Sequence, residues 1–373
     1  MQNEEKKVEY LELVYDLIFV YIIGRNNSLI HHVQDGFISG SIYLTYLVCS
    51  VIALFIWYQT TLFINRYGTN GRLEHIGIFI NMYLLYYMAQ GTRVDWQGYY
   101  ARYNVAWGLI VLNLAGMYLY RRRVASKNAP WEMAQITSVA RTLLIMAGLI
   151  FVSVPVYYAT GLPLSPLVLV YGLIDSIVSR NVNQLVAVDF SHLTERVMLY
   201  VVFTFGEMII GISGYFEGGI TLRNVFFSLM AFLIVVGLFL SYGFFYDHII
   251  DREAYANANI YMQIHIFLIV ALNNITTAME FMQEEEVAVI PKNIMLVASF
   301  LVYFLFLFLL EGFAKKKEQG NRRLLGLVLL LSLMFVGLMV ICYLYPHTSI
   351  TVSVLYVYAM FGLVYWFRES IKK

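Results

Sequence analysis

Apolar runs of about twenty residues recur along the whole chain, and they constrain its fold more than any other feature. An α-helix rises about 1.5 Å per residue, so a run of this length crosses the ~30 Å hydrocarbon core of a bilayer. Within that core every backbone amide needs an internal partner, which leaves the helix as the available conformation. Because 60% of the residues are hydrophobic and 13% are charged, a soluble domain could not bury this surface. The sequence therefore predicts an all-α, polytopic protein whose environment is the lipid bilayer.

Hydropathy predicts about twelve transmembrane helices. Their expected bounds are 9–27, 41–65, 73–91, 100–120, 138–159, 163–180, 192–214, 224–246, 259–281, 293–313, 323–344 and 349–367. If the N-terminus is cytoplasmic, most lysines and arginines near the helix ends fall on the inner side, as the positive-inside rule requires. Five basic residues fall on or near the outer side: Arg25, Arg93, Arg102, Arg223 and Lys292. An even number of spans with both termini cytoplasmic follows from this distribution.

The two halves of the chain show a weak internal similarity. The third and ninth predicted spans align at an offset of 190 residues, which pairs His75 with His265. Six spans per half would give both halves the same orientation, so the repeat would be parallel, about an axis along the membrane normal. We therefore expect a six-helix half at 1–180 and another at 181–373, with chance similarity between basic-ended apolar helices as the alternative.

Charged residues inside two of the predicted spans are the main candidates for a site. Charges in a bilayer are costly, so they normally face the protein interior or a watery cavity. Glu12 and Asp16 share one face of the first span, and Arg196 and Glu207 nearly share a face of the seventh. Both spans run in the same direction, so Asp16 and Arg196 should lie at similar depth. We predict an Asp16–Arg196 pair, and an Asn27–Glu207 contact further along, with Arg25 as the alternative partner of Glu207 if Gly24 breaks the helix.

Two interpretations of these charges remain open at the level of sequence. The Asp16–Arg196 pair could fix helix packing, or it could act as a gate or charge clamp for a solute. Glu207 is the sharper functional candidate, since it has no obvious cationic partner and lies beside Gly206, Gly211 and Gly214. A carboxyl in that position could exchange protons during transport.

Five further polar residues are secondary candidates. His192 and Glu195 have the i,i+3 spacing of some di-metal bundles, but no sequence pattern brings other ligands to them, so we predict no metal site. Asp175 either lies with the charged residues of the first and seventh spans or extends from a helix end toward water. His265 is expected to form hydrogen bonds near a helix end. Glu280 follows a polar stretch that could line a cavity.

Other features exclude function classes or indicate helix positions. No nucleophile motif, phosphate-binding loop or nucleotide fingerprint is present, and the net charge is +1, so neither a cofactor, an enzymatic activity nor a nucleic-acid partner is predicted. Trp57, Trp96, Trp131 and Trp366 lie near predicted membrane interfaces, as an aromatic belt would.

Two segments resemble the bacterial low-temperature requirement A (LtrA) family. Residues 12–20 (ELVYDLIFV) are similar to its opening motif of Glu-Leu, one or two aromatics and Asp-Leu-Val-Phe-Val. Residues 192–196 (HLTER), followed by Phe-Gly-Glu at 205–207, are similar to its second motif, His-x-x-Glu-Arg leading into Leu-Gly-Glu-Ser. Val14 replaces a usual aromatic, and Met208 replaces the serine. The resemblance implies a multi-pass protein of the bacterial inner (plasma) membrane, and it names no substrate.

The leading hypothesis is a secondary transporter of a small solute or ion, coupled to protons. Two six-helix halves would rock around a site lined by the first and seventh spans. The alternative is a non-transporting scaffold or lipid-interacting protein whose buried charges are structural. A membrane enzyme acting on lipid is a third hypothesis, which would require several histidines or carboxylates to converge at one interface. Homodimerisation is compatible with either of the first two.

Overall fold

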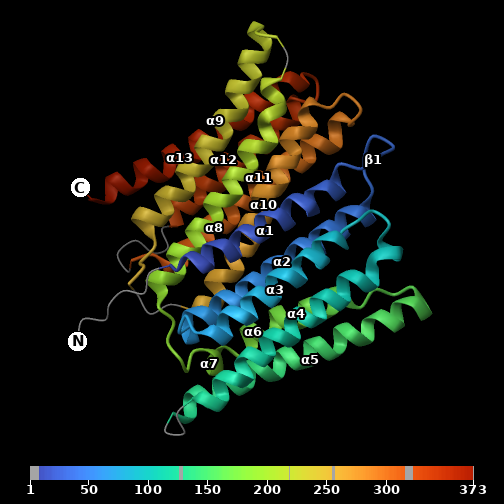
Figure 1. Cartoon of the computed structure of the whole chain (residues 1–373). Coiled ribbons are helices and arrows are strands. Elements are labelled where there is room, and N and C mark those ends of the chain that lie inside the picture. The colour runs from blue at the N-terminus through green and yellow to red at the C-terminus, as the bar shows by residue number, and fades with distance from the viewer. Residues whose placement is uncertain (1–7, 126–128, 218, 254–256, 316–321, 373) are drawn as a thin grey trace. The chain divides into compact units, whose positions relative to one another are not determined.

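The computed structural model describes residues 8–125, 129–217, 219–253, 257–315 and 322–372. Six of the lysines on the predicted inner side lie outside these ranges: Lys6, Lys7, Lys127, Lys316, Lys317 and Lys373. The placement of both termini in the cytoplasm therefore stays a prediction. The described residues are almost entirely helical (Figure 1).

Twelve α-helices of fourteen residues or more occur in the described ranges, and each overlaps a predicted span. They are α1 (Tyr10–Ile30), α2 (Gly40–Tyr67), α3 (Arg72–Gln90), α4 (Trp96–Val124), α5 (Pro130–Thr160), α6 (Ser165–Val178), α8 (Phe190–Gly211), α9 (Leu222–Phe244), α10 (Ala258–Gln283), α11 (Val289–Leu309), α12 (Arg322–Ile341) and α13 (Ser349–Lys372). Short helical turns extend or link them: α7 (Arg180–Asn183), η1 (Ile212–Phe216), η2 (Phe245–Ile249), η3 (Leu310–Phe313) and η4 (Pro346–Thr348).

Nine of these helices, within the described part of the chain, are long and apolar enough to cross a membrane. They are α1, α2, α5, α8, α9, α10, α11, α12 and α13, some with their short helical extensions. A chain with this many apolar helices, whose described residues form no sheet beyond one short hairpin, is a multi-pass α-helical membrane protein.

The remaining three long helices are less apolar or shorter. Asparagines and tyrosines, such as Asn81 in α3 and Asn104 in α4, lower the hydropathy of those two helices, and α6 has 14 residues. The expected number of twelve membrane crossings and the six-plus-six repeat therefore stay predictions.

The chain forms two compact units. Unit 1 contains residues 1–32, 40–199 and 252–266, and unit 2 contains residues 33–39, 200–251 and 267–373. The helices α8 and α10 each contribute to both units. The predicted division at residue 180 remains untested, because these units need not coincide with a sequence repeat.

In unit 1, α1 packs against α2 and α3, α3 against α4, and α4 along the whole of α5 (Figure 1). The helix α2 is deeply buried, and its segment from Ile52 to Ile64 is almost completely enclosed. Trp57 on α2 and Trp107 on α4 are fully buried and are the largest side chains of this core. A helix that is apolar all round must lie inside a bundle, which explains the central place of α2.

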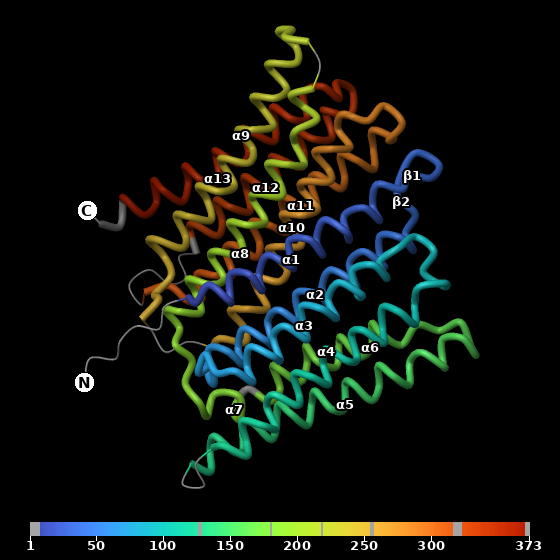
Figure 2. Tube along the Cα trace, viewed as in Figure 1, coloured from blue at the N-terminus to red at the C-terminus, as the bar shows by residue number. Residues whose placement is uncertain are grey.

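In unit 2, α9 packs against α13, and α12 packs against α11 and α13. A two-residue turn connects β1 (Val33–Gln34) to β2 (Phe37–Ile38) in a hairpin that follows α1 (Figure 2). Both turn residues, Asp35 and Gly36, have positive φ values, 52° and 84°. An Asp-Gly pair is a preferred sequence for such a turn, because Asp tolerates and Gly favours this conformation.

Candidate functional site

The inner face of α1 carries two carboxylates. Glu12 and Asp16 lie one turn apart and are 2% and 0% exposed, whereas Val14 and Leu17 on the opposite face are 40% and 51% exposed. The i,i+4 spacing therefore gives α1 one acidic stripe toward the interior of unit 1 and one apolar stripe toward its surroundings.

The first turns of α8 present a matching basic stripe. Asp189 caps the helix, and its Oδ1 accepts the backbone N–H of His192 at 3.0 Å. His192 and Arg196, again four residues apart, are 2% and 0% exposed. Glu195 points away from them and is exposed. The acidic pair on α1 and the basic pair on α8, each with i,i+4 spacing, thus face each other.

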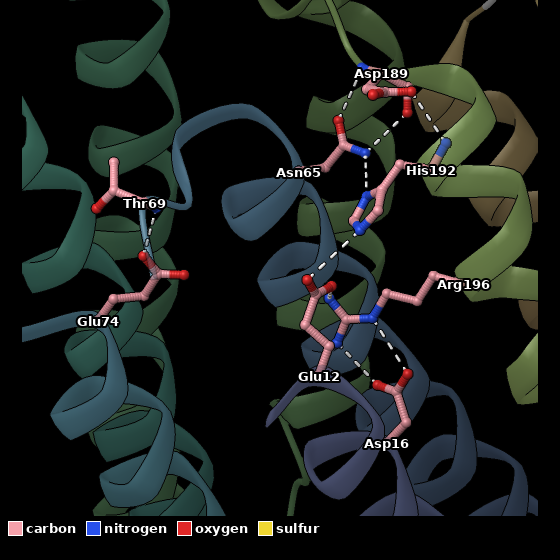
Figure 3. A network of polar contacts seen from close by, with 8 residues as sticks. All are labelled: Glu12, Asp16, Asn65, Thr69, Glu74, Asp189, His192 and Arg196. Atoms are coloured by element: carbon pink, nitrogen blue, oxygen red, sulfur yellow. Dashed lines mark hydrogen bonds and ion pairs between the residues drawn. The ribbon is translucent and has the colours of Figure 1, made fainter. Parts of the chain in front are cut away.

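Arg196 connects both carboxylates of α1 (Figure 3). Its Nε and Nη2 donate to Asp16 Oδ2 and Oδ1 at 3.2 and 2.8 Å, and its Nη1 donates to Glu12 Oε2 at 2.8 Å. The predicted Asp16–Arg196 contact is confirmed, and the geometry is the bidentate one that makes arginine–carboxylate pairs strong. The participation of Glu12 in the same pair is an addition to the prediction.

Asn65 of α2 sets the orientation of His192. Its amide group makes two bonds to the backbone of Asp189, from Nδ2 to the carbonyl at 2.9 Å and from the Asp189 N–H to Oδ1 at 3.0 Å. These two bonds fix which side of the amide carries the nitrogen. Nδ2 then donates to His192 Nδ1 at 3.0 Å, so the neutral ring carries its proton on Nε2, which lies 3.5 Å from Glu12 Oε1.

Trp57 of α2 also belongs to the site, and it does not lie where the sequence predicted. The residue is 0% exposed, and its Nε1 donates to Asp16 Oδ1 at 2.8 Å. The expectation that Trp57 belongs to an interfacial belt was wrong, because this indole is needed to satisfy a buried carboxylate. We call Glu12, Asp16, Trp57, Asn65, His192 and Arg196 the charge cluster; all six lie in unit 1.

The charge cluster is built from contacts within the protein. Its strongest contacts are direct ion pairs and hydrogen bonds, and among the described residues no group of three or more His, Cys, Asp or Glu is arranged to hold a metal. The i,i+3 pair of His192 and Glu195 does not act together, since one side chain is buried and the other exposed.

Asp175 and His265 lie in other surroundings within unit 1. Asp175 on α6 accepts from Thr142 Oγ1 at 2.8 Å and from Ser179 Oγ at 3.2 Å, and it borders a cavity of about 20 Å³. That volume holds about one water molecule. His265 on α10 is fully buried, and its Nδ1 lies 2.9 Å from the carbonyl of Tyr261, one turn earlier, to which it donates.

Unit 2 contains a second acidic site between α8 and α10. A Cβ placed on Gly211 would lie 2.6 Å from Glu280 Oε1 and 2.5 Å from Thr276 Cγ2, so the carboxyl of Glu280 packs directly over this glycine. Glu207 lies one turn earlier on the same face of α8 and is partly buried. Within the described residues, no hydrogen bond or ion pair of its side chain is seen.

The contact continues beyond Gly211. A Cβ placed on Gly214 would lie 3.4 Å from the terminal amide group of Gln283. The face is thus lined by glycines on one helix and by polar side chains on the other. We call Glu207, Gly211, Gly214, Thr276, Glu280 and Gln283 the carboxyl seam; all belong to unit 2.

A pocket of about 470 Å³ opens at the end of the carboxyl seam. Gly214 and Gln283 are shared by the seam and the pocket. The pocket also has basic and acidic side chains in its wall: Arg223, Lys292, His347, Glu217, Glu284 and Glu285. Its size is that of a small-molecule site, and the mixed charges suit a polar solute.

The predicted contact between Asn27 and Glu207 stays a prediction, because the two residues belong to different compact units. Asn27 on α1 is partly buried, and its neighbour Asn26 is the more enclosed of the two, with Nδ2 donating to Ser50 Oγ at 3.3 Å.

Comparison with known families identifies the chain. The family model for bacterial low temperature requirement A protein (LtrA) matches residues 7–359, nearly the entire sequence. The chain belongs to the LtrA family. No curated protein and no solved structure matches it.

The two LtrA-like motifs meet at the charge cluster. The first supplies Glu12 and Asp16, and the second supplies His192 and Arg196, so segments about 180 residues apart form one set of ion pairs. The departure at Val14 leaves this LtrA-family cluster intact, because Val14 lies on the outer face of α1.

Sequence reasoning missed Trp57, Asn65 and the capping role of Asp189. The spacing of Asp189 before His192 was an available signal, since an Asp three residues before a helical backbone N–H is a common cap. The contributions of Trp57 and Asn65 come from packing across helices, for which a single sequence has no local signal.

Proposed function

We propose that this LtrA-family protein transports a small solute or ion across the membrane and couples that movement to protons through Glu207 and Glu280. The observation that carries the proposal is the position of Glu207, a partly buried carboxyl in an apolar helix with no ion pair to another described residue. Ionisable groups at such positions are costly and usually belong to a transport or proton pathway.

The polarity of α10 along the carboxyl seam supports this role. Asn273 lies seven residues before Glu280 on the same face of α10, and its Nδ2 is buried without a hydrogen bond to any described residue. Buried polar atoms are nearly always satisfied in folded proteins, so this amide calls for a partner that enters the seam. Water or a passing polar solute would supply it.

Access from one end is supported by the pocket at Gly214 and Gln283. We propose that the solute first binds there, where basic and acidic side chains are both available, and that Glu280 and Glu207 exchange protons further along α8. The glycines at 211 and 214 allow the close approach that such a path requires.

We assign the charge cluster a different role in the same protein. Arg196 and Asp16 are 0% exposed and hold each other in a bidentate pair, which favours a fixed anchor of α1, α2 and α8 over a gate that must open. The alternative hypothesis, in which buried charges are structural, therefore accounts for the charge cluster. It does not account for Glu207.

A transport assay with defined solutes tests the proposal. Purified protein is reconstituted in liposomes, an inward proton gradient is imposed, and a mixture of amino acids, organic acids, sugars and metal ions is followed by mass spectrometry of the liposome contents. We expect at least one solute to accumulate with the wild-type protein, and Glu207→Gln to lower its initial rate at least about tenfold. Glu195→Gln, on the exposed side of the same helix, should transport normally.

Two outcomes would contradict the proposal. One is a mixture in which no solute accumulates above protein-free liposomes, and the other is full transport by the Glu207→Gln variant. Gel filtration and thermal unfolding show whether each variant is folded, and Glu280→Gln provides a second variant if the first is not.

We also propose an inner-membrane location with both termini in the cytoplasm, based on the distribution of lysine and arginine. Fusions of a reporter that is active in one compartment only, placed after residues 92 and 125 and at the C-terminus, would test it. The first should report the periplasm and the other two the cytoplasm; any other pattern contradicts this orientation.

A further inference from the structure

A groove of about 600 Å³ lies in unit 1, and none of its lining residues belongs to the charge cluster. Its walls come from the last turns of α2, the first half of α3 and the last turns of α4. A volume of this size is typical of small-molecule sites. The function proposed above does not use this groove.

The sides of the groove are apolar. Ile76 and Ile80 on α3 are 52% and 43% exposed, and they line the groove with the buried side chain of Met117 on α4. The sequence predicts that α3 and α4 cross the bilayer, and in that position these exposed apolar residues face hydrocarbon and the groove opens toward lipid chains. Gly116 lines it as well, and a Cβ placed there would meet no other atom within 4 Å.

One end of the groove is basic. Arg72 begins α3, is exposed, and forms no ion pair with a described residue. Arg121 lines the same end; its Nε and Nη2 both bind Glu132 Oε1, at 3.1 and 2.9 Å. Arg122 follows it directly and is exposed. Arginines at the end of apolar helices indicate the level of lipid headgroups.

The acidic residue in the groove has a local role. Glu74 Oε2 accepts the backbone N–H of Thr69 at 2.8 Å, which closes the turn between α2 and α3 (Figure 3). Glu74 is thereby held by the turn, and Glu132 by Arg121. Three basic side chains, Arg72, Arg121 and Arg122, then stand against the two carboxylates at this end, so its net charge is positive.

We propose that this groove binds an anionic phospholipid, with its phosphate at Arg72 and Arg121 and one acyl chain along Ile76, Ile80 and Gly116. The basic end and the apolar sides match the two parts of such a lipid, and basic pockets between membrane helices are known to bind anionic headgroups. A soluble anion would use the basic end alone, and a neutral lipid would use the apolar sides alone.

Binding of phosphatidylglycerol and phosphatidylcholine to the purified full-length protein in detergent tests the proposal, measured by native mass spectrometry. We expect phosphatidylglycerol to bind about fivefold more tightly than phosphatidylcholine, and Arg72→Gln to remove most of that preference, since one arginine near a headgroup is worth about this factor. Arg102→Gln, an exposed arginine at the other end of α4, should not change it.

A steric variant tests the position of the acyl chain. Gly116→Leu places a side chain in the open groove without a clash at its Cβ, and it should lower phosphatidylglycerol binding about tenfold. Gly148→Leu on α5 is the matched control, because that glycine is also exposed and has no atom within 4 Å of a Cβ. It should bind lipid like the wild type.

Three results would overturn the proposal. Unchanged lipid binding by Gly116→Leu would show that no acyl chain lies in the groove. Competition by inorganic phosphate at millimolar concentration would assign the basic end to a soluble anion. A dimer that Gly116→Leu dissociates, with lipid binding unchanged, would assign the groove to a second copy of the chain.

Discussion

The charge cluster in unit 1 and the carboxyl seam in unit 2 both place acidic side chains within apolar helices, yet they differ in how those side chains are satisfied. In the charge cluster, one guanidinium binds two carboxylates at 2.8 to 3.2 Å, and an indole N–H and an imidazole contact the same carboxylates. In the carboxyl seam, Glu207 is partly buried and has no such partner within the described residues.

This difference separates two uses of charge in a membrane protein. An enclosed network of ion pairs resists rearrangement, because removing one partner leaves the other as an uncompensated buried charge. A carboxyl without an ion pair can gain or lose a proton without dismantling its surroundings. This contrast underlies our proposal that the charge cluster holds helices together and that the carboxyl seam serves transport.

The largest effect is expected for Arg196→Met. This change leaves Glu12 and Asp16 buried without their guanidinium, which should lower the free energy of unfolding by about 3–5 kcal/mol. The yield of folded protein and the thermal unfolding midpoint would fall sharply. Adding Glu12→Gln and Asp16→Asn to this variant should restore part of the lost stability, because the resulting triple variant holds no unpaired carboxylate at these positions.

An Arg196→Met protein as stable as the wild type would remove the structural role of the charge cluster. The contrast between a structural charge cluster and a functional carboxyl seam would then fail, since Asp16 and Arg196 would again be candidates for a gate.

A smaller effect is expected for Trp57→Phe. Losing the indole N–H to Asp16 should cost about 2 kcal/mol, since hydrogen bonds to buried charged groups contribute at this level. Chemical unfolding in detergent measures it. Trp131→Phe is the control, because Trp131 on α5 is 54% exposed and should tolerate the change. Equal stability of the two variants would contradict the assignment of Trp57 to the cluster.

The smallest change in stability is expected for Gly211→Ala. This variant tests the contact between α8 and Glu280 in the carboxyl seam. In a helix, Gly→Ala usually stabilises by up to about 1 kcal/mol. At Gly211 the new methyl group meets Thr276 Cγ2 and Glu280 Oε1, so this gain should be lost and transport slowed. Gly206→Ala has open space around it and should keep both the gain and the transport rate.

Identical behaviour of these two alanine variants would mean that the approach of Glu280 to α8 is unimportant. Thermal unfolding and the liposome assay, carried out on the same preparations, provide both quantities.

Much of the fold could be predicted from hydropathy, because the length and apolarity of α5, α9 and α11 are properties of each segment alone. The sequence predicted a helix at each position where the structure has a long one. The number of membrane crossings is harder to predict, since α3 and α4 contain tyrosines and asparagines whose burial depends on neighbouring helices.

The charge cluster was partly predictable for a different reason. Glu12 and Asp16 on α1, and His192 and Arg196 on α8, each follow the i,i+4 rule, which is local. Their pairing across 180 residues followed from equal depth and opposite charge. Trp57 could not be assigned in this way, because its contact with Asp16 depends on how α1 packs against α2, and its sequence position resembles that of an interfacial tryptophan.

Water access to residue 207 tests the central claim most directly. In a background of Cys49→Ala and Cys342→Ala, Glu207→Cys and Ile209→Cys are reconstituted separately and exposed to a charged, membrane-impermeant thiol reagent. Our account predicts rapid labelling at 207 and very slow labelling at Ile209, which is 53% exposed on an apolar face of α8 where lipid excludes the reagent. Labelling at 207 as slow as at 209 would show that no aqueous path reaches the carboxyl seam, and it would contradict the account.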